Sequence, residues 1–136
     1  MISVFIADGS DSVREALCEA IAELDGVRLA GLAGDATCAL EGYLEQAAVR
    51  LTPQVVILDV QLANGSGLGV LQFIKHHFPA TKVIMLCDCA STMYRERCIV
   101  AGTDYFFDKA TEFPRVREVL RDLACLDDSP NFGIAA

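Results

Sequence analysis

Short apolar segments alternate with helical repeats along the chain, and turn residues separate them. The clearest segment is Val55–Leu58, four consecutive apolar residues that predict a strand buried on both faces. It ends on a carboxylate, Asp59, which would be costly to bury inside a strand but not at its end. The predicted strands cover residues 2–7, 27–33, 55–59, 83–86 and 105–107.

Apolar residues recur at helical spacing after each of these segments. The first helix is expected from about Val13 to the Asp25-Gly26 turn, and later helices over about 66–77 and around 94–101. Strands that alternate with helices predict an α/β domain with a parallel sheet, helices on both faces and right-handed crossovers. The expected N-caps of the first, second and fifth helices are Asp11, Asp35 and Thr111.

Length and composition indicate one globular domain. The chain has 136 residues, of which 53% are hydrophobic and 22% charged, which excludes a disordered chain. The net charge is −8 and basic residues are not clustered, so direct DNA binding is not expected. No apolar run reaches transmembrane length. We expect a domain over residues 1–125 and a short tail, 126–136, without an output domain.

Six cysteines are present, and a chain of this size and apolar content does not need disulfides. We therefore expect reduced, mostly buried cysteines in a cytoplasmic protein. Cys87-x-Cys89 stands alone, far in sequence from His76-His77, so a structural metal site is not expected. The cysteines are Cys18, Cys38, Cys87, Cys89, Cys98 and Cys125.

Three predicted strands are followed by a side chain that can carry charge. Asp8 follows the first strand, Asp59 ends the third, and Lys109 comes shortly after the fifth. Parallel strands end at the same edge of a sheet, so these side chains should gather there. Phosphoryl transfer to a carboxylate needs such a trio: a nucleophilic Asp, a second acid for Mg²⁺, and a lysine for the phosphoryl oxygens.

The same residues carry a family resemblance. The segments IADGSDSVREAL, VVILDVQLANGSGLGVL and FFDKA resemble the receiver domain of bacterial two-component response regulators, and the likeness spans about Met1–Leu123. It implies a flavodoxin-like (CheY-like) fold with strand order 2-1-3-4-5. By this resemblance Asp59 is the phosphoacceptor and Lys109 contacts the phosphoryl group. Mg²⁺ would bind Asp8, Asp59 and the backbone carbonyl of Gln61.

The resemblance also implies partners. A histidine kinase or phosphotransfer protein would supply the phosphoryl group, and a downstream protein would bind the face formed by the fourth helix, fifth strand and fifth helix. The chain would be a monomer or a phosphorylation-dependent dimer. It would be a signalling phosphoacceptor rather than an enzyme, although it could show weak autophosphatase activity.

Several positions depart from the family pattern. Gly9 stands where a second acid is usual, which predicts weaker Mg²⁺ binding; Asp11 could reach the metal, but capping is its plainer role. Cys87 holds the Thr or Ser switch position, and a thiol is a weak donor. Asp88 replaces a small residue, and could be solvated, repel a phosphoryl donor or add charge to the metal site. Phe106 holds the position of the switch aromatic, or simply packs in the core.

Two other classes of function stay open. A pseudo-receiver would keep the fold and work as a phosphorylation-independent binding module, as the departures suggest. An enzyme fits less well. A haloacid dehalogenase-type phosphatase would need an acid two residues after Asp59, where Gln61 stands. A flavodoxin would need a hydroxyl-rich phosphate loop, whereas residues 8–11 contain two acids.

Overall fold

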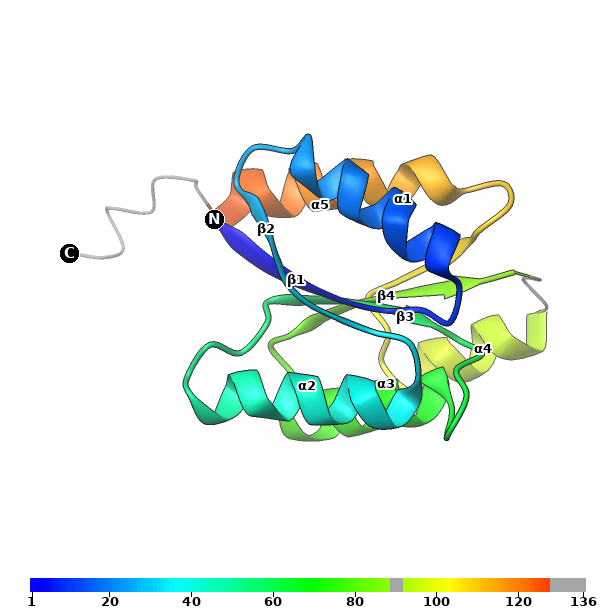
Figure 1. Cartoon of the computed structure of the whole chain (residues 1–136). Coiled ribbons are helices and arrows are strands. Elements are labelled where there is room, and N and C mark those ends of the chain that lie inside the picture. The colour runs from blue at the N-terminus through cyan, green and yellow to red at the C-terminus, as the bar shows by residue number, and fades with distance from the viewer. Residues whose placement is uncertain (89–91, 128–136) are drawn as a thin grey trace.

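Five parallel strands form one sheet in the order β2-β1-β3-β4-β5, as the resemblance implied (Figure 1). The structure is a computed structural model, and it describes residues 1–88 and 92–127. All neighbouring strands pair in parallel, so their carboxyl ends lie at one edge. The strands are β1 (Ile2–Ala7), β2 (Val27–Ala33), β3 (Val55–Asp59), β4 (Lys82–Cys87) and β5 (Tyr105–Asp108).

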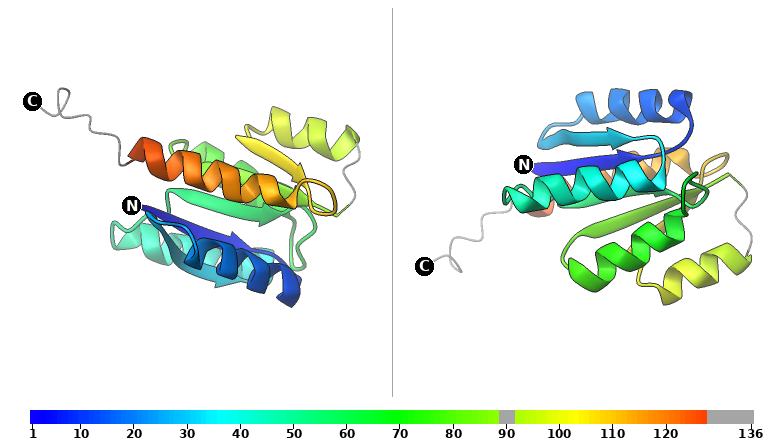
Figure 2. Two further views of the ribbon diagram at one scale, coloured as in Figure 1. Left: turned by 90° about the horizontal axis from the view of Figure 1, so that it is seen from above. Right: turned by 60° about the horizontal axis from the view of Figure 1, so that its bottom comes forward.

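Helices cover both faces of the sheet, as predicted from the alternation of strands and helices. In the view of Figure 1, α1 and α5 lie above the sheet and α2, α3 and α4 below it. Figure 2 shows the same layers from two further directions. The helices are α1 (Asp11–Ala22), α2 (Ala36–Ala48), α3 (Gly67–His77), α4 (Thr92–Val100) and α5 (Phe113–Asp127).

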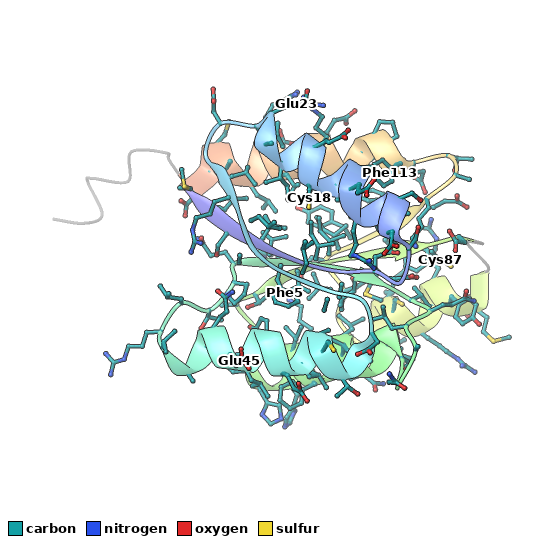
Figure 3. All side chains as sticks on the ribbon, in the orientation of Figure 1. Phe5, Cys18, Glu23, Glu45, Cys87 and Phe113 are labelled. Atoms are coloured by element: carbon teal, nitrogen blue, oxygen red, sulfur yellow. The ribbon has the colours of Figure 1, made fainter. Side chains whose placement is uncertain are left out.

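The central strands are buried on both faces and divide the core in two. Val55 and Ile57 pack with α1 and α5, whereas Val56 and Leu58 pack with α2 and α3. β1 alternates in the same way, and Phe5 lies on the α2 side (Figure 3). This two-sided burial holds the carboxyl ends of β1 and β3 rigidly side by side.

Two of the three expected N-caps are wrong. Ser10 caps α1, because its Oγ accepts a hydrogen bond from Val13 N at 3.3 Å, and Asp11 is already helical. α5 begins at Phe113, so Glu112 rather than Thr111 precedes it. Asp35 does cap α2, as predicted. Its Oδ1 accepts a hydrogen bond from Cys38 N at 2.8 Å.

The last helix extends past residue 125, where the expected domain boundary lay. Its final residue, Asp127, accepts a hydrogen bond from Gln54 Nε2 at 3.2 Å and forms an ion pair with the amino group of Met1 at 2.8 Å. These contacts tie the end of α5 to the amino ends of the strands. The rest of the expected tail, residues 128–136, lies outside the described residues.

None of the cysteines within the described residues forms a disulfide, but they are less buried than expected. Cys87 and Cys98 are buried, and Cys18 is half-buried. Cys38 on α2 and Cys125 on α5 are exposed, because these positions face away from the core. Cys89 lies outside the described residues. Among the described helices, none is both long enough and apolar enough to cross a membrane.

Candidate functional site at the carboxyl edge of the sheet

Asp8 follows β1 directly and is nearly inaccessible to solvent, with 1% of its side chain exposed. Its Oδ1 accepts a hydrogen bond from Ser10 N at 2.9 Å. The guanidinium of Arg14, from the first turns of α1, donates to the carbonyl oxygen of Asp8. These contacts fix the carboxylate and leave its second oxygen, Oδ2, directed into the site.

Asp59 is held in the same way at the end of β3. Its Oδ1 accepts a hydrogen bond from Gln61 N at 3.0 Å, so Oδ2 faces the site. The start of α3 approaches this residue closely, because Gly67 N donates to Val60 O at 3.0 Å. A Cβ built on Gly67 would lie 1.9 Å from the carbonyl oxygen of Asp59, so glycine is required there.

Lys109 lies between the two carboxylates. Its backbone N donates to Cys87 O at 2.9 Å, which continues the pairing of β4 with β5. Its Nζ lies 2.7 Å from Asp8 Oδ2 and 3.2 Å from Asp59 Oδ2. The structure therefore brings together the three side chains that the strand ends predicted. Their chemical roles stay predictions.

Burial and charge shift two pKa values in this cluster. Burial raises the pKa of Asp59, and the nearby charge of Asp8 raises it further; the Gln61 amide and Lys109 oppose this only in part. Burial alone would lower the pKa of Lys109. The hydrogen bonds and charges of Asp8 and Asp59 outweigh that effect, so this pKa lies above its usual value. The lysine is therefore a permanent ammonium at neutral pH.

We expect Asp59→Asn to stabilise the metal-free protein at neutral pH. Folding raises the pKa of Asp59, so its protonated form stabilises the fold at low pH. That stabilisation is lost as the pH rises through the pKa of Asp59 in the folded protein. The ionised carboxylate is thus unfavourable at pH 7, and the amide keeps an acceptor for Gln61 N. Thermal unfolding should show a melting temperature higher by a few degrees at pH 7, with a difference that shrinks toward pH 4.

A matched control for this prediction is Asp122→Asn, which removes an exposed carboxylate on α5. It should leave the melting temperature almost unchanged over the same pH range. A decrease in melting temperature for Asp59→Asn that is equal at all pH values would contradict the assignment of a raised pKa.

The positions that depart from the family pattern surround the cluster. Cys87 is fully buried at the end of β4 (Figure 3). Asp88 has 71% of its side chain exposed, which agrees with the solvated interpretation, and its Oδ1 lies 3.8 Å from Lys109 Nζ. Gly9 is exposed, and a Cβ added there would come no closer than 3.7 Å to Gly34 O. A Cβ at position 9 would therefore make only an ordinary contact.

The oxygen atoms of this cluster fit a hard cation such as Mg²⁺. Asp8 Oδ2 is buried, and the Lys109 ammonium at 2.7 Å is the polar contact that the described residues give it. No set of three or more His, Cys, Asp or Glu side chains within residues 1–88 and 92–127 could hold a metal ion. Two carboxylates, the predicted Gln61 carbonyl and water would be the ligands, and Mg²⁺ commonly keeps several waters.

The edge strand β5 forms a surface together with the helices α4 and α5. The sequence did not predict the side-chain contacts on this surface. The Arg95 guanidinium of α4 stacks on the Phe106 ring at 5.0 Å, and that of Arg115 of α5 on Phe107 at 5.4 Å. Both guanidinium groups lie 3.9 Å from the carboxylate of Glu112, in the loop after Lys109. Phe106 is buried, which supports core packing for its ring.

Sequence reasoning missed three residues that shape the site. Ser10 supplies both the helix cap and an amide for Asp8, Arg14 contacts the Asp8 backbone, and Gly67 allows α3 to approach Asp59. The pairing of Arg14 with Asp11 at helical i,i+3 spacing was visible in the sequence. The approach of Gly67 depends on tertiary packing and has no local signal.

Fold and site together define a doubly wound α/β domain with a cluster of charged side chains at the carboxyl edge of the sheet. Residues 4–121 match the family model for the response regulator receiver domain. The chain therefore belongs to the receiver-domain family of two-component signalling.

Similar proteins agree with this assignment. The response regulator GacA of Pseudomonas viridiflava is 26% identical over 89% of this chain and 54% of its own length. The signal receiver domain of a DNA-binding response regulator from Colwellia psychrerythraea superposes with a TM-score of 0.76 at 17% identity, over 90% of this chain and 98% of its own. The CheX–CheY–BeF3–Mg complex from Borrelia burgdorferi matches with a TM-score of 0.72 at 22% identity, over 88% and 89%.

The chain spans about half the length of the GacA relatives that it matches. The rest of each GacA protein lies outside its alignment with this chain. What those whole proteins do therefore carries over to this chain only as a proposal.

Proposed function

We propose that this receiver domain accepts a phosphoryl group on Asp59 from a histidine kinase or a phosphotransfer protein. The observation that carries the proposal is the bridging of Asp8 and Asp59 by the Lys109 ammonium, at 2.7 Å and 3.2 Å. A carboxylate nucleophile, a second acid and a fixed cation at one edge of a sheet are the parts that acyl phosphate formation requires.

Each residue has a distinct task in this reaction. An Asp59 oxygen bonds to phosphorus as the bond to the donor breaks, which gives an acyl phosphate. Lys109 remains as an ammonium and neutralises charge on the phosphoryl oxygens. Asp8, Asp59 and the Gln61 carbonyl would hold Mg²⁺, which supplies further positive charge when it is bound. The absence of an acid at Gly9 makes that binding weak.

The signal would pass to a protein partner through α4, β5 and α5. Glu112 joins this face to the site, because it follows Lys109 in the same loop and its carboxylate lies near Arg95 and Arg115. Cys87 occupies the switch position, where its thiol would bond a phosphoryl oxygen only weakly. We propose a cytoplasmic domain that does not bind DNA directly. It would be a monomer, or a dimer once phosphorylated.

A pseudo-receiver is the second candidate, and the charged cluster is compatible with it in one respect. The Lys109 ammonium lies 2.7 Å from Asp8 and 3.2 Å from Asp59, and its charge holds the three side chains together whether or not Asp59 accepts a phosphoryl group. In that case the face formed by α4, β5 and α5 would bind its partner in the unmodified protein.

Intact-mass measurement after incubation with acetyl phosphate separates the two candidates. We expect a phosphoryl adduct that requires Mg²⁺ and is absent from Asp59→Asn. Asp122→Asn, an exposed acid on α5, should form the adduct at the wild-type rate. If no adduct forms at high donor and high Mg²⁺ concentrations, the pseudo-receiver is the better account.

A further inference from the structure

The proposed function leaves Asp88 without a task, although it contacts the site. Its Oδ1 lies 3.8 Å from Lys109 Nζ, the same atom that contacts Asp8 at 2.7 Å and Asp59 at 3.2 Å. Three carboxylates therefore share one ammonium. A small residue at position 88 would leave Lys109 to the two buried acids alone.

Asp88 differs from the other two acids in its exposure. Its side chain is 71% exposed, compared with 8% or less for Asp8, Asp59 and Lys109. It therefore lies on the solvent side of the shared ammonium. A phosphoryl donor that reaches Asp59 must come from solvent, and so approaches a negative charge before it reaches the lysine.

We propose that Asp88 is a specificity-determining residue that disfavours small anionic phosphoryl donors. It repels such donors, and it competes with the incoming phosphoryl group for the Lys109 ammonium. Donors that neutralise the negative charge of Asp88 as they bind can still transfer a phosphoryl group to Asp59. This inference rests on the proposed function of Asp59, which must first accept a phosphoryl group.

The reaction itself shows which rate Asp88 should change. An Asp59 oxygen bonds to phosphorus while the P–O bond of acetyl phosphate breaks, and acetate leaves with the bonding electrons. The phosphoryl group is anionic in the transition state and in the product, so Asp88 raises the energy of both. Formation of the acyl phosphate should therefore be slowed, whereas its later hydrolysis should hardly change.

The test compares the wild-type chain with Asp88→Asn at pH 7 in the presence of Mg²⁺, with adduct followed by intact mass. With acetyl phosphate, a dianion at this pH, the variant should react about tenfold faster. With phosphoramidate, mainly a monoanion, the gain should be smaller. Added salt should accelerate the wild type more than the variant, because it screens Asp88. After the donor is removed, the wild type and Asp88→Asn should lose the adduct at rates that agree within about twofold.

Two further variants separate charge from other effects. Asp88→Glu keeps the carboxylate and should stay slow, whereas Asp122→Asn removes an exposed acid on α5 and should not accelerate the reaction. Equal formation rates for wild type and Asp88→Asn would overturn the inference, and so would a change confined to hydrolysis. If no protein forms an adduct, the proposed function fails and this inference fails with it.

Discussion

Replacing Gly9 with aspartate is expected to increase the affinity for Mg²⁺ by about tenfold. The substitution places a second carboxylate beside Asp8, where the family pattern has one. Sterically it is allowed, because the nearest atom to a Cβ at position 9 is Gly34 O at 3.7 Å, an ordinary contact. The gain comes from one more negative oxygen ligand and less reliance on water.

Isothermal titration calorimetry with MgCl₂ measures this effect directly. Gly9→Asn is the matched control, because it adds a side chain of the same shape without the charge, and its affinity should stay near that of the wild type. Equal gains for the two variants would show that the extra charge is not the cause. No gain for Gly9→Asp would place the cation away from Asp8.

Gly67→Ala is expected to destabilise the fold by about 3 kcal/mol. The added Cβ would lie 1.9 Å from Asp59 O and 2.9 Å from Val60 Cα, both backbone atoms that cannot rotate away. The first turn of α3 must therefore move away from the end of β3. Urea unfolding should show a lower midpoint with an unchanged slope.

Gly69→Ala is the control in the same helix. Its Cβ would come within 3.2 Å of Ser66 Oγ, a side-chain atom that can shift slightly, and alanine favours the helix. We expect a change within about 1 kcal/mol of the wild type. If Gly67→Ala were equally mild, the close approach of α3 to Asp59 would not be a constraint on the fold.

The central strands of the sheet were predictable because they are apolar over most of their length. Val55–Leu58 allowed only a strand buried on both faces, and the structure confirms that burial on every residue. The convergence of Asp8, Asp59 and Lys109 followed from parallel topology alone, since each stands at the carboxyl end of a strand. The apolar pattern of the strands was therefore enough to predict which side chains meet at this edge of the sheet.

The errors arose where neighbouring residues have equal local preferences. Ser10 and Asp11 are both good N-caps, and the structure has extended backbone at Ser10 and helical backbone from Asp11 onward. Cys38 and Cys125 are as apolar as the buried cysteines, but their helices turn them to solvent. The contact of Asp88 with Lys109 depends on the packing of β4 against β5, which no local pattern specifies.

We propose that Asp59 itself carries the phosphoryl group. The most direct measurement treats the Mg²⁺- and acetyl phosphate-incubated protein with sodium borohydride, which reduces an acyl phosphate of aspartate to homoserine. Peptide mass spectrometry then locates the homoserine. We expect homoserine at position 59, and only when Mg²⁺ was present. Homoserine at position 8 or 88, or at no position, would contradict it.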